Sequence, residues 1–172
     1  MHDSIEQIAI HESGHALAHI LTGLKFSFVT IDPIALKIHT DGKSLGYILP
    51  IQTYSGEESG TYNKLSPPEF FQCFSEDVTI IGGYVAQRLF EKKFDRTGSQ
   101  TDIANLNSNR MMNQAEPFRS IYRKFLFAYT FELFGLNENK RMIKKIAKEL
   151  LKRKTLSFDE VNRIVNQHVG TD

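Results

Sequence analysis

Apolar residues recur every three or four positions near the start of the chain, and this spacing is typical of an amphipathic helix. Asp3 or Ser4 can cap the beginning of that helix. Gly23 is suited to end it, because glycine readily adopts the left-handed conformation found just after helices. The apolar positions that carry the pattern are Ile5, Ile8, Ala9, Ala16, Leu17, Ile20 and Leu21. The pattern therefore predicts one helix with a clear start and a clear end.

From Ser66 onward the chain again shows mostly helical spacing. Ser66 and Glu69 form a capping box, and the two prolines between them fit the first turn of a helix. We expect this helix to reach about Lys93, with a bend or an interruption at Gly82-Gly83. Further helices are predicted at residues 101–116, 118–134, 138–153 and 158–169.

The region between these helical segments has short runs of β-branched and aromatic residues, which favour strands. Strands are predicted at residues 25–31, 34–39 and 45–50. Asp32-Pro33 separates the first two, and the polar, glycine-containing residues 52–65 predict an exposed loop. Together these patterns predict a mainly α fold with a small β element (α+β). The absence of a linker or repeat favours a single domain over residues 1–172.

Composition then restricts the class of protein. The formal net charge is +1, so charge gives no argument for a nucleic-acid partner. Cys73 is the single cysteine, which excludes an intrachain disulfide. No stretch reaches the roughly 18 apolar residues of a transmembrane helix, and the N-terminus lacks the basic and apolar regions of a signal peptide. We therefore expect a soluble, cytoplasmic protein with no transmembrane segment.

The first predicted helix contains the sequence His-Glu-Ser-Gly-His, an HExxH motif. His11 and His15 are four residues apart, so a helix places both imidazoles on one face, where they can bind one Zn²⁺. Glu12 lies between them in sequence and can reach a water on the same metal as a catalytic base. The motif therefore predicts a zinc hydrolase, and most helices of this kind belong to peptidases.

A catalytic zinc needs a third protein ligand as well as an open position for water. His19 lies one turn beyond His15 and is too far along the helix axis to join the same metal. Asp102 follows a polar, glycine-containing segment at a predicted helix start, from which its carboxylate can point inward. An aspartate in the first turn is also favourable for the helix dipole alone. The spacing therefore leaves both roles of Asp102 open, metal ligand and helix-stabilising residue.

Five segments together form a more specific pattern. They are IHESGHALA, LGYILP, GGYVAQRLF, TGSQTDIANL and LLKRKTLSFDEVNRIV, in this order. The series resembles the peptidase domain of FtsH-type AAA proteases and covers nearly the whole chain. Its most specific parts are the HExxH motif and the Gly-x-x-x-Asp sequence that ends at Asp102. The resemblance implies an FtsH-peptidase-like zincin fold, which is mostly helical with a small β element.

The resemblance also implies a ligand set and an activity. By position, His11, His15 and Asp102 would hold one Zn²⁺ per chain, with Glu12 as the catalytic base. The activity implied is that of a zinc metalloendopeptidase, which hydrolyses peptide bonds through a metal-activated water. One departure lies after the Gly-Gly segment, where the family has an acidic pair and this chain has Gln87-Arg88.

The resemblance has further implications for partners. Members of the family carry an ATPase module, whereas this sequence contains no phosphate-binding Gly-rich loop with Lys-Ser/Thr, so we expect a stand-alone peptidase domain. The expected substrate is an unfolded protein or a peptide. One alternative is a proteolytic subunit that depends on a separate ATPase chain. Assembly into a homo-oligomer is also compatible with the sequence. An alternative from another class is a noncatalytic zinc-binding interaction module.

Overall fold

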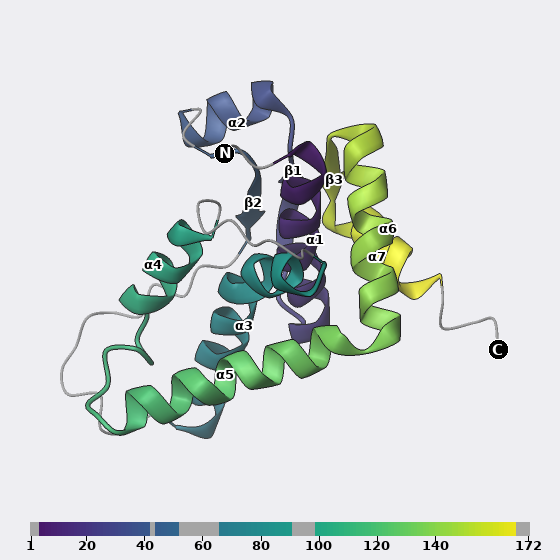
Figure 1. Cartoon of the computed structure of the whole chain (residues 1–172). Helices are drawn as coiled ribbons and strands as arrows, with labels where there is room; N and C mark the ends of the chain where they lie inside the picture. The colour runs from purple at the N-terminus through teal and green to yellow at the C-terminus, as the bar shows by residue number, and fades with distance from the viewer. Residues whose placement is uncertain (1–3, 42–43, 52–65, 91–98, 168–172) are drawn as a thin grey trace.

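The computed structural model describes residues 4–41, 44–51, 66–90 and 99–167. In chain order the elements are α1 (Ile5–Thr22), β1 (Phe26–Thr30), α2 (Pro33–Thr40), β2 (Tyr47–Pro50), α3 (Pro67–Phe90), α4 (Gln100–Ser108), α5 (Phe118–Gly135), α6 (Asn137–Arg153), β3 (Thr155–Ser157) and α7 (Phe158–Asn166) (Figure 1). The predicted mainly α fold with a small sheet is confirmed. The predicted loop at 52–65 and two predicted helix ends, at Lys93 and Val169, lie outside the described residues.

Helix α1 begins and ends where the sequence predicts. Ser4 forms a reciprocal capping box with Gln7, in which each side chain accepts a hydrogen bond from the other residue's backbone N–H. Gly23 ends the helix with φ of 75°, the left-handed conformation. The helix packs against α3, α6, α7 and the sheet, and every residue from 11 to 19 is buried. The HExxH motif therefore lies inside the molecule, on a helix enclosed by several neighbours.

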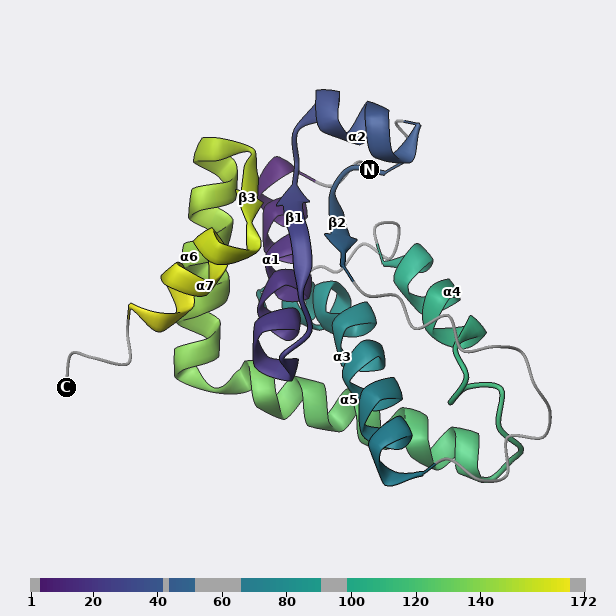
Figure 2. The same cartoon turned by 180° about the vertical axis from the view of Figure 1, so that it is seen from behind.

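The three strands form one antiparallel sheet in the order β2-β1-β3. Figure 2 shows β1 in front of α1, with which both β1 and β2 are in contact. Strand β3 is absent from the sequence-based prediction. It pairs Leu156 with Val29 of β1, more than a hundred residues earlier, and both side chains are buried in the core. A three-residue strand of this kind is defined by its distant partner rather than by its own composition.

The strand predicted at 34–39 is wrong, because these residues belong to helix α2. The carboxylate of Asp32 accepts a hydrogen bond from the Ile34 N–H at 3.2 Å, as an N-cap does. Pro33 follows in the first turn, where its missing N–H costs nothing. The Asp-Pro pair therefore starts a short helix, and β3 supplies the third strand instead.

The helix predicted at 101–116 is shorter than expected, since α4 ends at Ser108. Asn109 leaves the helical conformation and adopts an extended backbone, with φ of −77° and ψ of 157°. Its side-chain amide donates to the carboxylate of Asp77 on α3 at 2.6 Å. A tertiary hydrogen bond thus accompanies the end of a helix that local spacing would have continued.

Close packing of α1 and α3 depends on glycines in both helices. A Cβ on Gly14 would lie 2.5 Å from the Cβ of Ala86, and a Cβ on Gly82 would lie 2.8 Å from the carbonyl oxygen of Gly14. The two backbones therefore touch without intervening side chains. The predicted bend or interruption at Gly82-Gly83 does not break α3, which runs as one helix through both residues.

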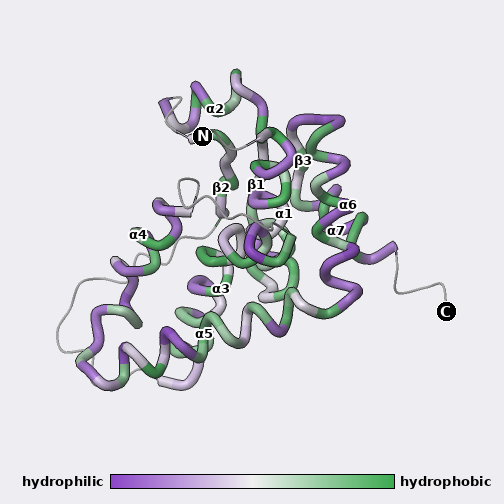
Figure 3. The backbone as a smooth tube through the Cα atoms, in the orientation of Figure 1, coloured by the Kyte–Doolittle hydropathy of each residue, from purple (hydrophilic) through white to green (hydrophobic). Residues whose placement is uncertain are grey.

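The core lies where α1, α3, α5 and α6 meet. Figure 3 shows hydrophobic and hydrophilic positions alternating along α6, as expected for a helix with one packed and one solvated face. Its buried positions include Ile143, Ile146 and Leu150, and Leu17 and Val85 are buried on α1 and α3. Across the described ranges, no helix combines the length and the apolar character needed to cross a membrane.

Candidate metal centre

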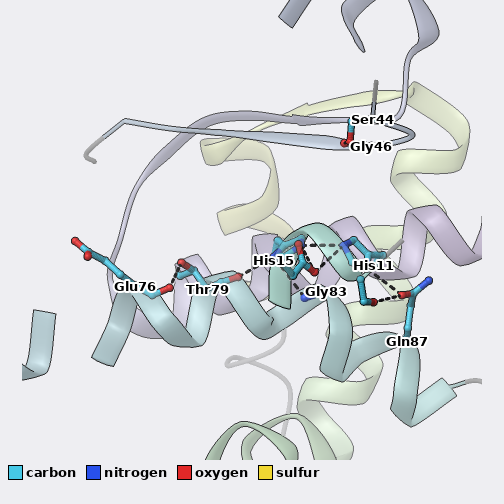
Figure 4. A network of polar contacts seen from close by, with 10 residues as sticks. His11, His15, Ser44, Gly46, Glu76, Thr79, Gly83 and Gln87 are labelled. Carbon is cyan, nitrogen blue, oxygen red and sulfur yellow. Dashed lines mark hydrogen bonds and ion pairs between the residues drawn. The ribbon is translucent and has the colours of Figure 1, made fainter. Parts of the chain in front are cut away.

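Two histidines of α1 lie one helical turn apart and face α3. His11 and His15 are both buried, and their Nε2 atoms are 3.0 Å apart. Figure 4 shows the two imidazole rings side by side, between Thr79 and Gln87 of α3. The four-residue spacing of the HExxH motif has therefore brought two nitrogen donors to one point, as the sequence predicts.

Asp102 reaches the same point from α4. It lies in the first turn of that helix and is buried. Its Oδ2 is 3.2 Å from the Nε2 of His11 and 3.5 Å from the Nε2 of His15. This position is compatible with both roles that the sequence leaves open, since Asp102 is in the first turn of α4 and its carboxylate lies against the two histidines. The three residues form a group whose ligand atoms all lie within 4.8 Å of one another.

The hydrogen bonds of the histidines determine which ring nitrogen carries the proton. His15 Nδ1 lies 2.7 Å from the backbone carbonyl of Thr79, which can only accept, so Nδ1 must be the donor. The Gly83 N–H lies farther from the same nitrogen, at 3.4 Å, and does not change this assignment. His11 Nδ1 donates to the side-chain oxygen of Gln87 at 3.0 Å. In a neutral imidazole, the unprotonated Nε2 therefore faces the other two ligands.

This arrangement fits a divalent metal ion. With Nδ1 protonated in both histidines, two nitrogen lone pairs and a carboxylate oxygen converge at separations of 3.0, 3.2 and 3.5 Å. Three acceptors this close repel one another unless a cation or a proton lies between them. Ligands at zinc distances of 2.0–2.1 Å in a tetrahedral arrangement are about 3.3 Å apart. The donor set and its spacing therefore match those of a His₂Asp zinc site.

Without a metal, protons take the place of the cation. Burial lowers the pKa of His15, but the Asp102 carboxylate outweighs that effect, and the pKa is raised to about 9. Burial likewise raises the pKa of Asp102, while the two histidines hold it below its ordinary value. The apoprotein therefore holds an ion pair at this site. A metal ion that binds must displace the proton that His15 holds.

Glu12 lies beside the three ligands and is buried. Burial raises the pKa of its carboxyl group above the ordinary value, and the positive charge of His11 and His15 opposes the rise. Its Oε2 accepts no hydrogen bond from any residue that the structure describes. A buried carboxylate oxygen without a partner is costly, and such exceptions are expected where the group has a catalytic role. The position and the chemistry of Glu12 are those expected of a general base.

Two glycines leave the space that these side chains occupy. A Cβ on Gly83 of α3 would lie 2.5 Å from the Nε2 atoms of both His11 and His15. A Cβ on Gly46, just before β2, would lie 2.5 Å from the Cγ of Glu12. Any larger residue at either position would displace a side chain of the site.

His19, which the sequence places too far along α1, does not join the cluster. Its ring packs edge-on against Phe26 at 5.4 Å between centroids. Burial, together with the nearby charge of His15, lowers the pKa of His19 to about 4, so the ring is neutral near pH 7. This histidine is a packed core residue.

Several residues of the site were not found from the sequence. Thr79 acts through its backbone carbonyl, which no side-chain motif can reveal. Gln87 departs from the acidic pair that the resemblance implies, yet it is buried and bonds to His11. The side chain of Ser99, the N-cap residue of α4, donates to the same Gln87 oxygen at 3.0 Å. The spacing of Gln87 one helical turn after Gly83 is the signal that could have identified it.

Comparison with known proteins gives no family assignment. No protein-family model matches the sequence, and no curated protein matches it significantly. The function must therefore be argued from the geometry of His11, Glu12, His15 and Asp102.

Proposed function

We propose that this protein is a zinc metalloendopeptidase that uses Glu12 as its general base. The observation that carries the proposal is the convergence of three buried ligand atoms beside a buried carboxylate with a free oxygen. Structural zinc sites usually have four protein ligands, whereas catalytic sites have three and an open position. Within the described ranges, three residues make up this group. The ligand number therefore favours a catalytic site over a noncatalytic zinc-binding module.

When bound by His11, His15 and Asp102, zinc would lower the pKa of a coordinated water and polarise the carbonyl of the scissile peptide bond. Glu12 would take a proton from the attacking water while the oxygen of that water bonds to the carbonyl carbon. The same carboxyl group would then give that proton to the leaving amine as the C–N bond breaks. The Nδ1–H groups of the histidines stay bonded to α3 throughout and hold both rings in place.

The β2 strand offers a place for an extended substrate. It lies at one edge of the sheet and pairs with β1 on its other side. Gly46, at the start of this strand, touches the side chain of Glu12. A peptide that added to the sheet edge by backbone hydrogen bonds would therefore pass close to the proposed base. Such binding needs an unfolded segment, which is the reason for proposing unfolded proteins and peptides as substrates.

The resemblance to the FtsH-type peptidase domain supports the same activity, and it agrees with the positions of all four site residues. We infer that the domain works in the cytoplasm. If a separate ATPase chain supplies unfolded substrate, the protein alone would cleave flexible peptides but not folded proteins. Assembly into a homo-oligomer is compatible with either arrangement.

The decisive experiment compares the wild type with Glu12→Gln on an unstructured, fluorescently labelled protein. We expect the wild type to cleave it when loaded with zinc and Glu12→Gln to lose at least about 100-fold in rate, because the amide cannot accept a proton. Zinc stoichiometry, measured for both, is expected to be one per chain, since Glu12 is not a ligand. Cleavage that survives in Glu12→Gln would refute the proposed base. Stoichiometric zinc with no cleavage in the wild type would favour the noncatalytic module.

A further inference from the structure

One side chain of α3 connects two of the three metal ligands. The Oε1 atom of Gln87 accepts a hydrogen bond from His11 Nδ1 and another from the Ser99 hydroxyl, each at 3.0 Å. Ser99 is the N-cap residue of α4, three positions before Asp102. Both contacts are buried, and Gln87 itself is 1% exposed. A single oxygen atom thus links the helix that carries His11 to the start of the helix that carries Asp102.

We propose that Gln87 is a positioning residue that sets the metal affinity of this site. It does so by holding His11 and helix α4, which carries Asp102, in fixed positions relative to each other. The proposal rests on the metal-binding part of the proposed function and not on peptidase activity. His15 has an independent support, the carbonyl of Thr79. His11 and α4, in contrast, share one support, so the loss of Gln87 affects two ligands at once.

The first effect of Gln87 is on the tautomer of His11. An acceptor at Nδ1 keeps the proton there and leaves Nε2 free to bind a metal. With an apolar side chain in place of Gln87, the buried Nδ1–H would have no partner, and the ring would gain by turning or by moving its proton to Nε2. Either change removes a ligand atom from the site.

The second effect is on the position of α4. This helix contacts α3, and polar side chains at its two ends bond to α3. Ser99 bonds to Gln87 at the N-terminal end, and Asn109 bonds to Asp77 at the C-terminal end. The Ser99 contact is the nearer of the two to Asp102 along the chain. It therefore has the greater control over the carboxylate.

The test measures zinc affinity by competition with a chromophoric chelator for the wild type, Gln87→Met and Gln87→Glu. Methionine keeps the length and bulk of glutamine but is a poor acceptor, and we expect it to weaken zinc binding about 10–100-fold. Glutamate keeps an acceptor for both donors, so Gln87→Glu is expected to bind at least as tightly as the wild type. The absorption spectrum of bound Co²⁺ is expected to change in Gln87→Met and to stay like the wild type in Gln87→Glu.

A double-mutant cycle separates positioning from a general loss of packing. Ser99→Ala is expected to weaken zinc binding in the wild type but to add little in Gln87→Met, because the shared oxygen is already gone. Thr130→Val is the matched control, since it removes a buried hydroxyl that bonds only within α5, and it should leave zinc affinity unchanged. Circular dichroism of each apoprotein verifies folding.

Several outcomes would overturn the proposal. Equal zinc affinity in Gln87→Met and the wild type would show that Gln87 does not position the ligands. Equal weakening by Gln87→Met and Gln87→Glu would show that packing matters and the acceptor does not. If the wild type binds no zinc, both this inference and the proposed function fail. If it binds zinc but cleaves nothing while Gln87→Met binds weakly, the proposed activity fails and the inference stands.

Discussion

Gly46, just before β2, lies against the side chain of Glu12, the proposed general base. A Cβ at Gly46 would lie 2.5 Å from the Cγ and 2.6 Å from the Cδ of Glu12, well inside van der Waals contact. The atoms that would have to move belong to the end of a flexible side chain. A larger residue would therefore redirect the carboxylate without unfolding the protein.

We predict that Gly46→Ala lowers the rate of peptide cleavage by at least about 10-fold, because a base displaced by even 1 Å loses its alignment with the attacking water. Zinc affinity should be unchanged, since the three atoms nearest to a Cβ at Gly46 all belong to Glu12, and Glu12 is not itself a ligand. The measurements are cleavage rate and zinc affinity on the same preparation. Gly135→Ala is the matched control, because a Cβ there meets no other atom within 4 Å. Full activity in Gly46→Ala would contradict the proposed geometry.

Among single residues, the sequence predicts those whose role depends only on their spacing within one helix. His11 and His15 follow from the motif because helical spacing alone places them on one face, and Glu12 follows from its place between them in the HExxH sequence. Asp102 could not be assigned from spacing, since its approach to the histidines depends on how α4 packs on α3. The supporting contacts of Gln87 could not be predicted either, because they join three elements that are far apart in sequence.

The buried carboxylate of Asp77 on α3 bonds to α5 and to the residue that follows α4. It accepts hydrogen bonds from the Tyr122 hydroxyl and the Asn109 amide, each at 2.6 Å. Burial raises the pKa of Asp77 to about 6, and the two hydrogen bonds only partly oppose the rise. The folded protein therefore holds a proton on Asp77 at pH values where the unfolded chain has lost it.

This difference predicts how stability depends on pH. Between the unfolded pKa of 3.8 and the folded pKa of about 6, the folded state binds more protons. The contribution of Asp77 to the free energy of unfolding is therefore fully present below pH 3.8 and is lost, by up to about 3 kcal/mol in all, as the pH rises through 6. Urea unfolding of the wild type and of Asp77→Asn between pH 4.5 and 8 measures this contribution, as the difference between the free energies of unfolding of the two proteins.

Subtracting the Asp77→Asn values removes the titration of the metal-site residues, which both proteins share. The expected difference shrinks as the pH rises through 6 and levels off at about pH 7. A difference that does not vary with pH, or one that grows as the pH rises, would show that Asp77 is ionised in the folded protein throughout this range.

The elements that the sequence predicts correctly are those with local start and stop signals. The ends of α1 follow from Ser4 and Gly23, whose cap geometry needs no tertiary contact. The strand predicted at 34–39 is wrong because its apolar alternation also fits α2, and the Asp-Pro cap decided the outcome. β3 could not be found because a three-residue strand exists only through its pairing with β1.

At the scale of the whole molecule, the proposed site is built from ligands that are distant in sequence. His11 and His15 come from α1 and Asp102 from α4, and both helices pack on α3. An unfolded chain would not hold these ligands together, so zinc binds the folded state in preference. Metal binding is therefore expected to add to the stability of the entire fold rather than to that of one helix.

We predict that zinc raises the thermal unfolding midpoint. Free zinc at 1,000 times its dissociation constant adds about 4 kcal/mol, which for a chain of this size is roughly 8–16 °C. Calorimetry of the apoprotein with and without zinc measures the shift. Asp102→Ala should lose most of it, whereas Glu12→Gln should keep it, because Glu12 acts on substrate and binds no metal. The shift should also shrink as the pH falls, since zinc must displace the proton that His15 holds with a pKa of about 9. An equal shift in the wild type and Asp102→Ala would show that zinc binds elsewhere and that α4 contributes no ligand.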